Sequence, residues 1–202
     1  MKKLLLQTLI GLTLGLAIVV GVSYFTQPYT YQGSLIDPPA PASDFTLSAN
    51  AGTTFQLSEQ HGKTVLVFFG YTHCPDVCPT TLYDFKQIKA LLGNQADAIR
   101  FVFITVDPER DIIEMLGEFV TAFDSEFIAL SGTLDELQPV YAAYGVYRQK
   151  NDVGSAAGYL MDHTARVYVI DPNGNLRLTF PFGMAPEAMA QDLAHLMKEK
   201  VE

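Results

Sequence analysis

The chain has few basic residues, and this shortage limits what it can bind. Thirteen Lys and Arg stand against 22 Asp and Glu, which gives a formal net charge of −9. Because Lys2 and Lys3 lie at the N-terminus, the rest of the chain carries eleven basic and 22 acidic residues, a balance of −11. Such a surface has no basic patch for nucleic acid or for anionic lipid head groups. It is compatible with a basic protein partner, although acidic surfaces commonly serve solubility.

Several other features are missing as well. The sequence has no internal repeat, no phosphate-binding glycine loop, and no low-complexity tract outside residues 26–43. The N-terminus has no Arg- and Ser-rich presequence, which argues against import into an organelle. The chain is long enough for one well-buried domain plus a short extra segment.

That extra segment is expected at residues 1–25. Lys2 and Lys3 precede an uncharged run over residues 4–25, about the length needed to cross a bilayer. Lysines before the span predict that the N-terminus stays in the cytoplasm and the rest is exported. No clear Ala-x-Ala site follows, so a retained anchor is favoured over a cleaved signal peptide. We therefore expect a single-pass protein of a bacterial inner membrane, with its folded part in the periplasm.

Residues 26–43 contain four prolines and Gly33, and are expected to form an extended, semi-rigid stalk. The folded domain is then predicted over residues 44–202. Its first elements are predicted to be a hairpin of 45–47 and 53–55, a buried strand 64–69, a helix whose first residue is Pro79, a buried strand 99–106, and a helix from 111 with one apolar face. The later elements are predicted to be a strand 127–130, a helix 134–144, a polar loop 145–158, a hairpin of 165–170 and 176–180, and a helix 185–200.

This alternation of strands and helices predicts the fold class. It is typical of an α/β domain with a four- or five-stranded mixed sheet and helices on both faces. Both cysteines follow the first buried strand directly, at the start of a helix. A thioredoxin-like architecture is the natural candidate for such an order.

Cys74 and Cys78 are the only cysteines, and their spacing constrains their chemistry. A helix N-terminus favours the thiolate over the thiol. Two cysteines in an exported protein normally suggest a structural disulfide. On a regular helical turn, however, positions i and i+4 place Cβ atoms about 5–6 Å apart, whereas a disulfide needs about 3.5–4.5 Å. A reversible disulfide stays possible with some distortion, but the spacing favours a soft metal ion such as Cu(I) or zinc.

Two sulfur atoms leave a metal site incomplete, and the four histidines are the first candidates to complete it. We expect His61 and His195 at the surface, and the side chain of His73 to point away from that of Cys74. His163 immediately precedes a predicted core strand that could lie beside the cysteine strand. A Cys₂His set from Cys74, Cys78 and His163 would suit copper or zinc.

Three further residues have two readings each. Asp162 is either a partner that orients the imidazole of His163 or a surface acid. Met161 and Met184 are soft enough to be additional ligands, but buried methionines more often only pack.

Three segments of the sequence form a recognisable set. They are Gly-Tyr-Thr-His-Cys-Pro-Asp-Val-Cys-Pro at 70–79, Val-Asp-Pro-Glu-Arg-Asp at 106–111, and Asp-His at 162–163 before Val-Tyr-Val-Ile-Asp-Pro-Asn-Gly at 167–174. Together they resemble the Sco/SenC family of copper proteins, which is needed for cytochrome c oxidase assembly. The resemblance covers the whole predicted domain. It implies a thioredoxin-like fold that binds one copper, as Cu(I) or Cu(II), through Cys74, Cys78 and His163.

The resemblance also implies a function. The protein would deliver copper to the binuclear copper site of cytochrome c oxidase subunit II, or reduce the cysteines of that site. Its other partners would be periplasmic copper carriers or thiol reductants. Such a metallochaperone is not an enzyme.

Three alternatives stay open. A membrane-anchored thiol–disulfide reductase would use Cys74 and Cys78 without copper. A peroxiredoxin-like peroxidase is disfavoured because Tyr71-Thr72-His73-Cys74 lacks a threonine three residues before the cysteine. An inert disulfide in an adhesion or scaffold module would need no metal at all.

Overall fold

The computed structural model describes residues 2–25, 28–50, 52–155 and 158–199, and the chain divides into two compact units, residues 1–30 and 31–202. The first unit contains one helix, α1 (Lys2–Phe25). Over the described residues, no helix has both the length and the hydropathy that a bilayer crossing requires. The transmembrane anchor predicted over residues 1–25 is therefore not confirmed.

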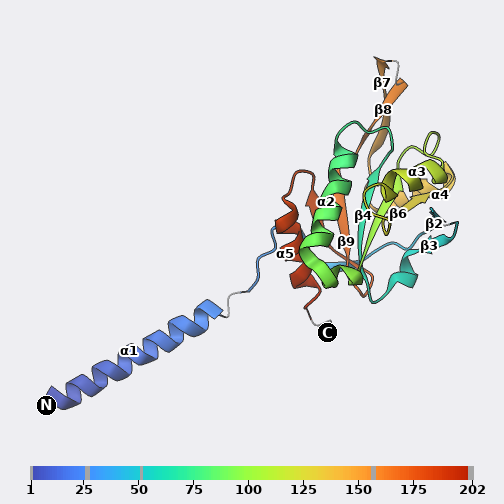
Figure 1. Ribbon diagram of the computed structural model, residues 1–202. Helices are drawn as coiled ribbons and strands as arrows, with labels where there is room; N and C mark the ends of the chain where they lie inside the picture. The colour runs from blue at the N-terminus through green and yellow to red at the C-terminus, as the bar shows by residue number, and fades with distance from the viewer. Residues whose placement is uncertain (1, 26–27, 51, 156–157, 200–202) are drawn as a thin grey trace. The chain divides into compact units, whose positions relative to one another are not determined.

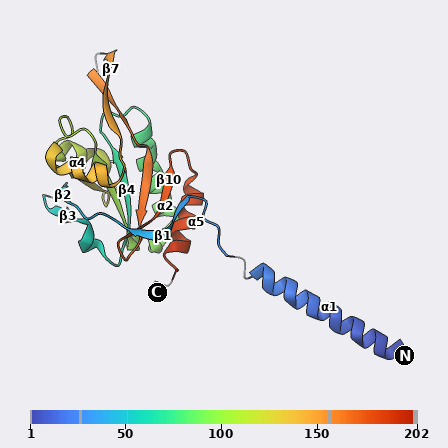
Figure 2. The same cartoon turned by 180° about the vertical axis from the view of Figure 1, so that it is seen from behind.

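The second unit is built on one mixed sheet of eight strands (Figures 1 and 2). In spatial order these are β1 (Ser34–Pro41), β10 (Asn175–Pro181), β9 (Arg166–Ile170), β4 (Thr64–Gly70), β5 (Ile99–Thr105), β6 (Ile128–Ser131), β2 (Thr46–Ala49) and β3 (Thr54–Gln56). Strands β4, β5 and β6 run parallel, and the remaining pairs are antiparallel. The predicted mixed sheet is confirmed, but four or five strands was too few, because β1 and the β2–β3 hairpin extend it at its two edges.

The second half of the predicted stalk is one of these edge strands. Residues 34–41 pair with β10, with a register shift between Leu35 and Ala40 that takes in Pro38 and Pro39. Proline has no backbone N–H to donate to a neighbouring strand. It is therefore tolerated at sheet edges and bulges, where that hydrogen bond is not needed. A proline-rich composition therefore did not exclude a strand, and residues 34–41 belong to the folded domain.

Helices cover both faces of the sheet, as predicted. They are α2 (Val77–Leu92), α3 (Ile113–Thr121), α4 (Leu134–Ala143) and α5 (Pro186–Leu196), with short 3₁₀ turns at Leu57–Gln60 and Gly93–Ala98. Phe68 and Phe69 are consecutive in β4 and point to opposite faces. Phe68 contacts Phe103, which contacts Phe119 of α3, with ring centroids 5.7 and 6.0 Å apart. Phe69 contacts Tyr141 of α4, 6.1 Å away. An apolar layer therefore lies on each side of β4.

Two predicted helices differ in detail. The apolar face of α3 is narrower than expected, because Leu116 and Val120 are buried while Ile112 and Met115 remain 54% and 45% exposed. Helix α2 begins at Val77, two residues before the predicted start, so Pro79 is its third residue. The N–H groups of the first helical turn have no intrahelical acceptor, which lets proline occupy any position there.

The prediction of a polar loop over residues 145–158 is wrong. Strands β7 (Arg148–Ser155) and β8 (Gly158–His163) form a separate antiparallel ribbon, which projects from the domain at the top of Figure 1. The ribbon residues are mostly exposed and polar, so no alternating apolar pattern marks them in the sequence. The two strands obtain their ladder hydrogen bonds from each other rather than from the sheet.

Candidate metal centre

The cysteine side of the centre is built where β4 passes into α2. Cys74 lies half-buried in the connection, and Cys78 lies fully buried in the first turn of α2. The backbone N–H of Cys78 donates to the Cys74 sulfur at 3.3 Å. Gly70 leaves room for this packing, because a Cβ there would lie 2.7 Å from the Phe103 ring and 2.8 Å from the Cys78 sulfur.

The two thiols have opposite acidities. Hydrogen bonding, chiefly from the Cys78 thiol and further from His163 and backbone N–H groups, lowers the pKa of Cys74 to about 4 despite its partial burial. Burial raises the pKa of the Cys78 thiol, and the neighbouring Cys74 thiolate raises it further. In the metal-free protein at neutral pH, Cys74 is therefore a thiolate next to a protonated Cys78.

The histidine side comes from the other end of the sequence. Strand β9 pairs antiparallel with β4, which brings His163 at the end of β8 next to the cysteines. Its Nε2 lies 3.7 Å from the Cys78 sulfur, and its Nδ1 lies 3.2 Å from the Thr164 carbonyl oxygen. The ring contacts Phe68 and Tyr71 edge to face, at 6.0 and 5.8 Å. In a metal-bound centre the neutral ring would carry its proton on Nδ1, donating to the carbonyl, and Nε2 would turn its lone pair towards the ion.

The three donor atoms converge on one point. One ligand atom each from Cys74, Cys78 and His163 lie within 4.8 Å of one another. Two thiolates and an imidazole are soft and borderline ligands, a set that suits copper or zinc. The structure thus brings together the three residues that the sequence singled out, and their role as ligands stays a prediction.

The centre opens to one side. A pocket of about 260 Å³ is lined by Cys74 and the turn that follows it, by residues 160–163 of β8, and by Tyr71 and Ala165. Cys74 and His163 line this pocket, whereas Cys78 lies behind them in the core. An ion held here would be reachable from solvent through this pocket.

The remaining candidate residues lie elsewhere. His73 is exposed and its ring contacts the Thr72 hydroxyl, at 2.9 Å, rather than the sulfurs. His61 and His195 are surface residues, as predicted. Asp162 is exposed and 3.4 Å from Asn151, so the Thr164 carbonyl, not Asp162, orients the imidazole.

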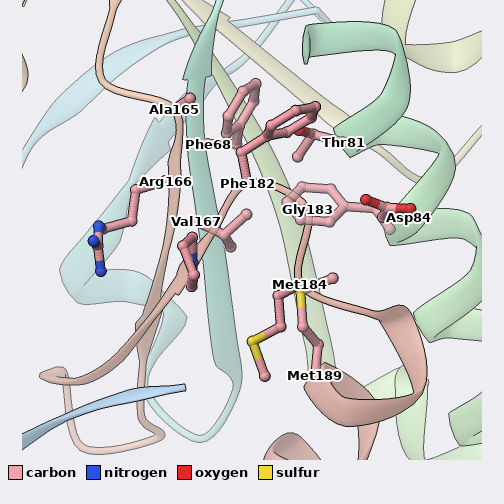
Figure 3. A pocket seen from close by; sticks show the side chains of 12 residues that line it. Phe68, Thr81, Asp84, Ala165, Arg166, Val167, Phe182, Gly183, Met184 and Met189 are labelled. Atoms are coloured by element: carbon pink, nitrogen blue, oxygen red, sulfur yellow. The ribbon is translucent and has the colours of Figure 1, made fainter. Parts of the chain in front are cut away.

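The two methionines also differ from each other. Met161 is buried and lines the pocket of the candidate centre. Met184 lines a different, much smaller pocket, together with Met189, Phe68 and Phe85 (Figure 3). That pocket lies between α2, α5 and the sheet. Met184 is half-buried and packs against the core there, and it does not line the pocket of the candidate centre.

The comparisons with known proteins agree with this geometry. The model of the SCO1/SenC family matches residues 34–198. This chain belongs to the SCO1/SenC family. The match begins at the first residue of β1, which again assigns residues 34–41 to the domain. The family resemblance drawn from three sequence segments is confirmed.

Two solved structures and one curated relative illustrate the similarity. ScoI of Bradyrhizobium japonicum, solved with copper bound, is 37% identical, with coverage of 78% of this chain and 99% of that chain and a TM-score of 0.71. The apo Sco1 protein of Thermus thermophilus is 35% identical, with coverage of 83% and 98% and a TM-score of 0.74. A SCO2-like protein of Rickettsia felis is 34% identical over 151 residues, 74% of each chain. The predicted thioredoxin-like domain of this family is thus the observed fold.

Sequence reasoning missed the residues that hold the two sides of the centre. The segment 106–111 served only as a mark of the family. In the structure, Asp111 accepts hydrogen bonds from Thr72, two residues before Cys74. Arg110 stacks on Tyr159, four residues before His163. A run of acidic residues and an arginine directly after a buried strand was the available signal.

Proposed function

We propose that this protein is a copper carrier that binds one copper ion through Cys74, Cys78 and His163. It would deliver the ion to the binuclear copper site of cytochrome c oxidase subunit II. The observation that carries this proposal is the convergence of the three donor atoms within 4.8 Å. The copper-bound state of the similar Bradyrhizobium protein supports copper over zinc as the ion.

The geometry suggests how the ion is released. Cys78 and His163 hold it from the core side and from the ribbon, while Cys74 faces the pocket. An incoming thiolate of a partner enters through the pocket and displaces Cys74 first. The ion then passes by stepwise exchange of one sulfur for another. Because a disulfide between Cys74 and Cys78 removes two of the three donors, loading requires a thiol reductant.

Copper titration tests the ligand set. The reduced domain, titrated with Cu(I) against a chromogenic Cu(I) chelator, should bind one ion per chain. Cys78→Ser and His163→Ala should each weaken binding by a factor of 10 or more, whereas His61→Ala, the same substitution at an exposed histidine, should not. Unchanged affinity in His163→Ala would refute the three-residue site. Transfer is then measured by mixing the loaded protein with a soluble subunit II domain.

A second candidate function is thiol–disulfide reduction, favoured by the pairing of a Cys74 thiolate with a buried Cys78 thiol. Cys74 would attack a client disulfide and form a mixed disulfide, releasing one client thiolate. Cys78 would then lose its proton and attack Cys74, which leaves a Cys74–Cys78 disulfide and a second client thiolate. A thiol reductant restores the pair. His163→Ala separates the two functions, because it should lower copper affinity and leave the dithiol able to react.

The location belongs to the same proposal. The uncharged run over residues 4–25 and the preceding Lys2 and Lys3 support retention in a bacterial inner membrane, with the domain in the periplasm. The support comes from the sequence. Expression of the full chain in a bacterium, followed by membrane fractionation and protease treatment of spheroplasts, tests it. Recovery of the protein in the soluble cytoplasmic fraction would overturn it.

A further inference from the structure

We propose that Asp107, Arg110 and Asp111 form a brace that sets the separation between His163 and the two cysteines. The three residues lie in the turn between β5 and α3, and none of them is among the candidate ligands. They are positioning residues, since they act through the ribbon and the cysteine turn. The inference rests on the proposed copper site.

One end of the brace holds the ribbon that carries His163. The Arg110 Nε donates to Asp107 at 2.5 Å, and its Nη1 donates to the Tyr159 carbonyl oxygen at 2.9 Å. The Arg110 guanidinium lies over the Tyr159 ring, 3.7 Å from its centroid. The Tyr159 hydroxyl donates to the other Asp107 oxygen at 2.8 Å. Asp107, which is fully buried, thus binds Arg110 and Tyr159 at once.

These contacts matter because the ribbon lies outside the main sheet. Within the described residues, β7 and β8 pair only with each other. Arg148 of β7, directly opposite His163 in the ribbon, adds a hydrogen bond from Nε to the Val106 carbonyl oxygen at 2.8 Å. The short connection from His163 to β9 places it near the sheet, and the side-chain contacts to the segment around the brace hold the rest of the ribbon against the domain.

The other end of the brace holds the cysteine turn. The Asp111 carboxylate accepts the Thr72 backbone N–H at 3.2 Å, the Thr72 hydroxyl at 2.5 Å and the Thr105 hydroxyl at 2.7 Å. Arg110 also lies 5.8 Å from the centroid of the Tyr71 ring, which packs against His163. The short turn 107–111 thus contacts both sides of the candidate centre.

One nitrogen of Arg110 is destabilising where it lies, which a residue present only for stability would avoid. Among the described residues, the Arg110 Nη2 is a buried donor without a hydrogen-bond partner. An unpaired buried donor of this kind is destabilising. Violations of this kind are expected where function constrains the structure. Beyond its ion pair with Asp107, Arg110 places Tyr159 through the stacked ring and the bond to its carbonyl oxygen.

Two mild substitutions test the brace on its ribbon side. Tyr159→Phe removes one hydroxyl and keeps the ring, and Arg110→Gln removes the guanidinium. Each should weaken Cu(I) binding by up to about 10-fold, the lower end of the effect of losing a direct hydrogen-bond partner of a metal ligand, because both residues act on His163 through the ribbon. Glu114→Gln is the matched control, because Glu114 is an exposed acidic residue in the first turn of α3, close to the brace in sequence. It should keep the parent affinity.

A double-mutant comparison separates positioning from a general loss of stability. In a His163→Ala background, Tyr159→Phe should cause no further loss of affinity, since its effect passes through the missing imidazole. Asp111→Asn, which acts on the cysteine turn, should weaken binding in both backgrounds. Equal losses from Tyr159→Phe with and without His163 would overturn the proposal. So would parent affinity in both Tyr159→Phe and Arg110→Gln.

A metal-free readout keeps this test distinct from that of copper binding. In the apo protein, amide hydrogen exchange of β8 should accelerate in Tyr159→Phe and Arg110→Gln while exchange in β4 stays unchanged. If the parent fails to bind Cu(I), the copper proposal fails, and the exchange data still decide whether the brace holds the ribbon. Parent-like exchange in both variants would refute the brace.

Discussion

The two sides of the candidate centre are built in different ways. Cys74 and Cys78 lie on the direct passage from β4, whose residues are all buried, into α2. His163 ends a ribbon that is mostly exposed and pairs outside the main sheet. The cysteine side is thus held by the core. The histidine side is held by its short connection to β9, by ring contacts to Phe68 and Tyr71, and by polar contacts of the ribbon to the turn 107–111.

This difference suggests a division of labour. A side held by core packing keeps its geometry whenever the protein is folded. A side held by a few side-chain contacts at the surface is the one that local changes can shift without unfolding the domain. The cysteines would then be required for copper binding, and the position of the ribbon would set the affinity. Four experiments test this contrast, beginning with the one in which the two sides should differ most.

The first asks whether the cysteine side sets its own acidity. In the apo protein the Cys74 thiolate should persist above a pKa of about 4 and be lost as the pH falls through that value. Because the Cys78 thiol is the main cause, Cys78→Ala should raise this pKa by more than His163→Ala does. Thiolate absorbance and alkylation rate against pH measure both. A larger shift in His163→Ala would contradict the contrast.

The second compares the folding energetics of the two sides. Phe68, at the centre of β4, is about 1% exposed, so Phe68→Ala should lower the free energy of unfolding by about 3–5 kcal/mol. Leu160 in β8 is only partly buried, and Leu160→Ala should lower it by less than about 1 kcal/mol. Urea unfolding of both variants gives the two values. Similar losses would show that the ribbon belongs to the core.

The third tests the close packing at the end of β4. In Gly70→Ala the new methyl group would lie under 3 Å from both Phe103 and the Cys78 sulfur. Overpacking of a tight core costs about 1–3 kcal/mol, and here it should also displace a donor atom. We expect lower stability together with weaker Cu(I) binding. Loss of stability with unchanged affinity would show that the sulfur position tolerates movement.

The fourth perturbs stability away from the centre. Thr133 and Glu136 form a capping box at the start of α4, with Glu136 N–H donating to the Thr133 hydroxyl at 3.3 Å. Thr133→Ala should lower the free energy of unfolding by about 1 kcal/mol. Because α4 packs on the side of β4 opposite Phe68, Cu(I) affinity should not change. A fall in affinity would mean that global stability, and not the way each side is held, controls binding.

The sequence predicted the cysteine side well because its signals are local. An unbroken β-branched and aromatic run, a proline near a helix start and two cysteines lie within twenty residues. The ribbon was predicted as a loop because apolar and polar residues do not alternate along its strands. The edge strand 34–41 was predicted as a stalk because proline is rare in strands. An edge strand tolerates proline, since its outer side forms no ladder hydrogen bonds.

Residue types and their order by themselves determined the family, the α/β class and the identity of three candidate ligands. Tertiary structure alone decided that His163 lies 3.7 Å from the Cys78 sulfur, and that Asp107, Arg110 and Asp111 connect both sides. The reason is physical. Spacing along a chain fixes only neighbours within one strand or helical turn, whereas contacts between distant segments depend on strand pairing and side-chain packing that no local pattern records.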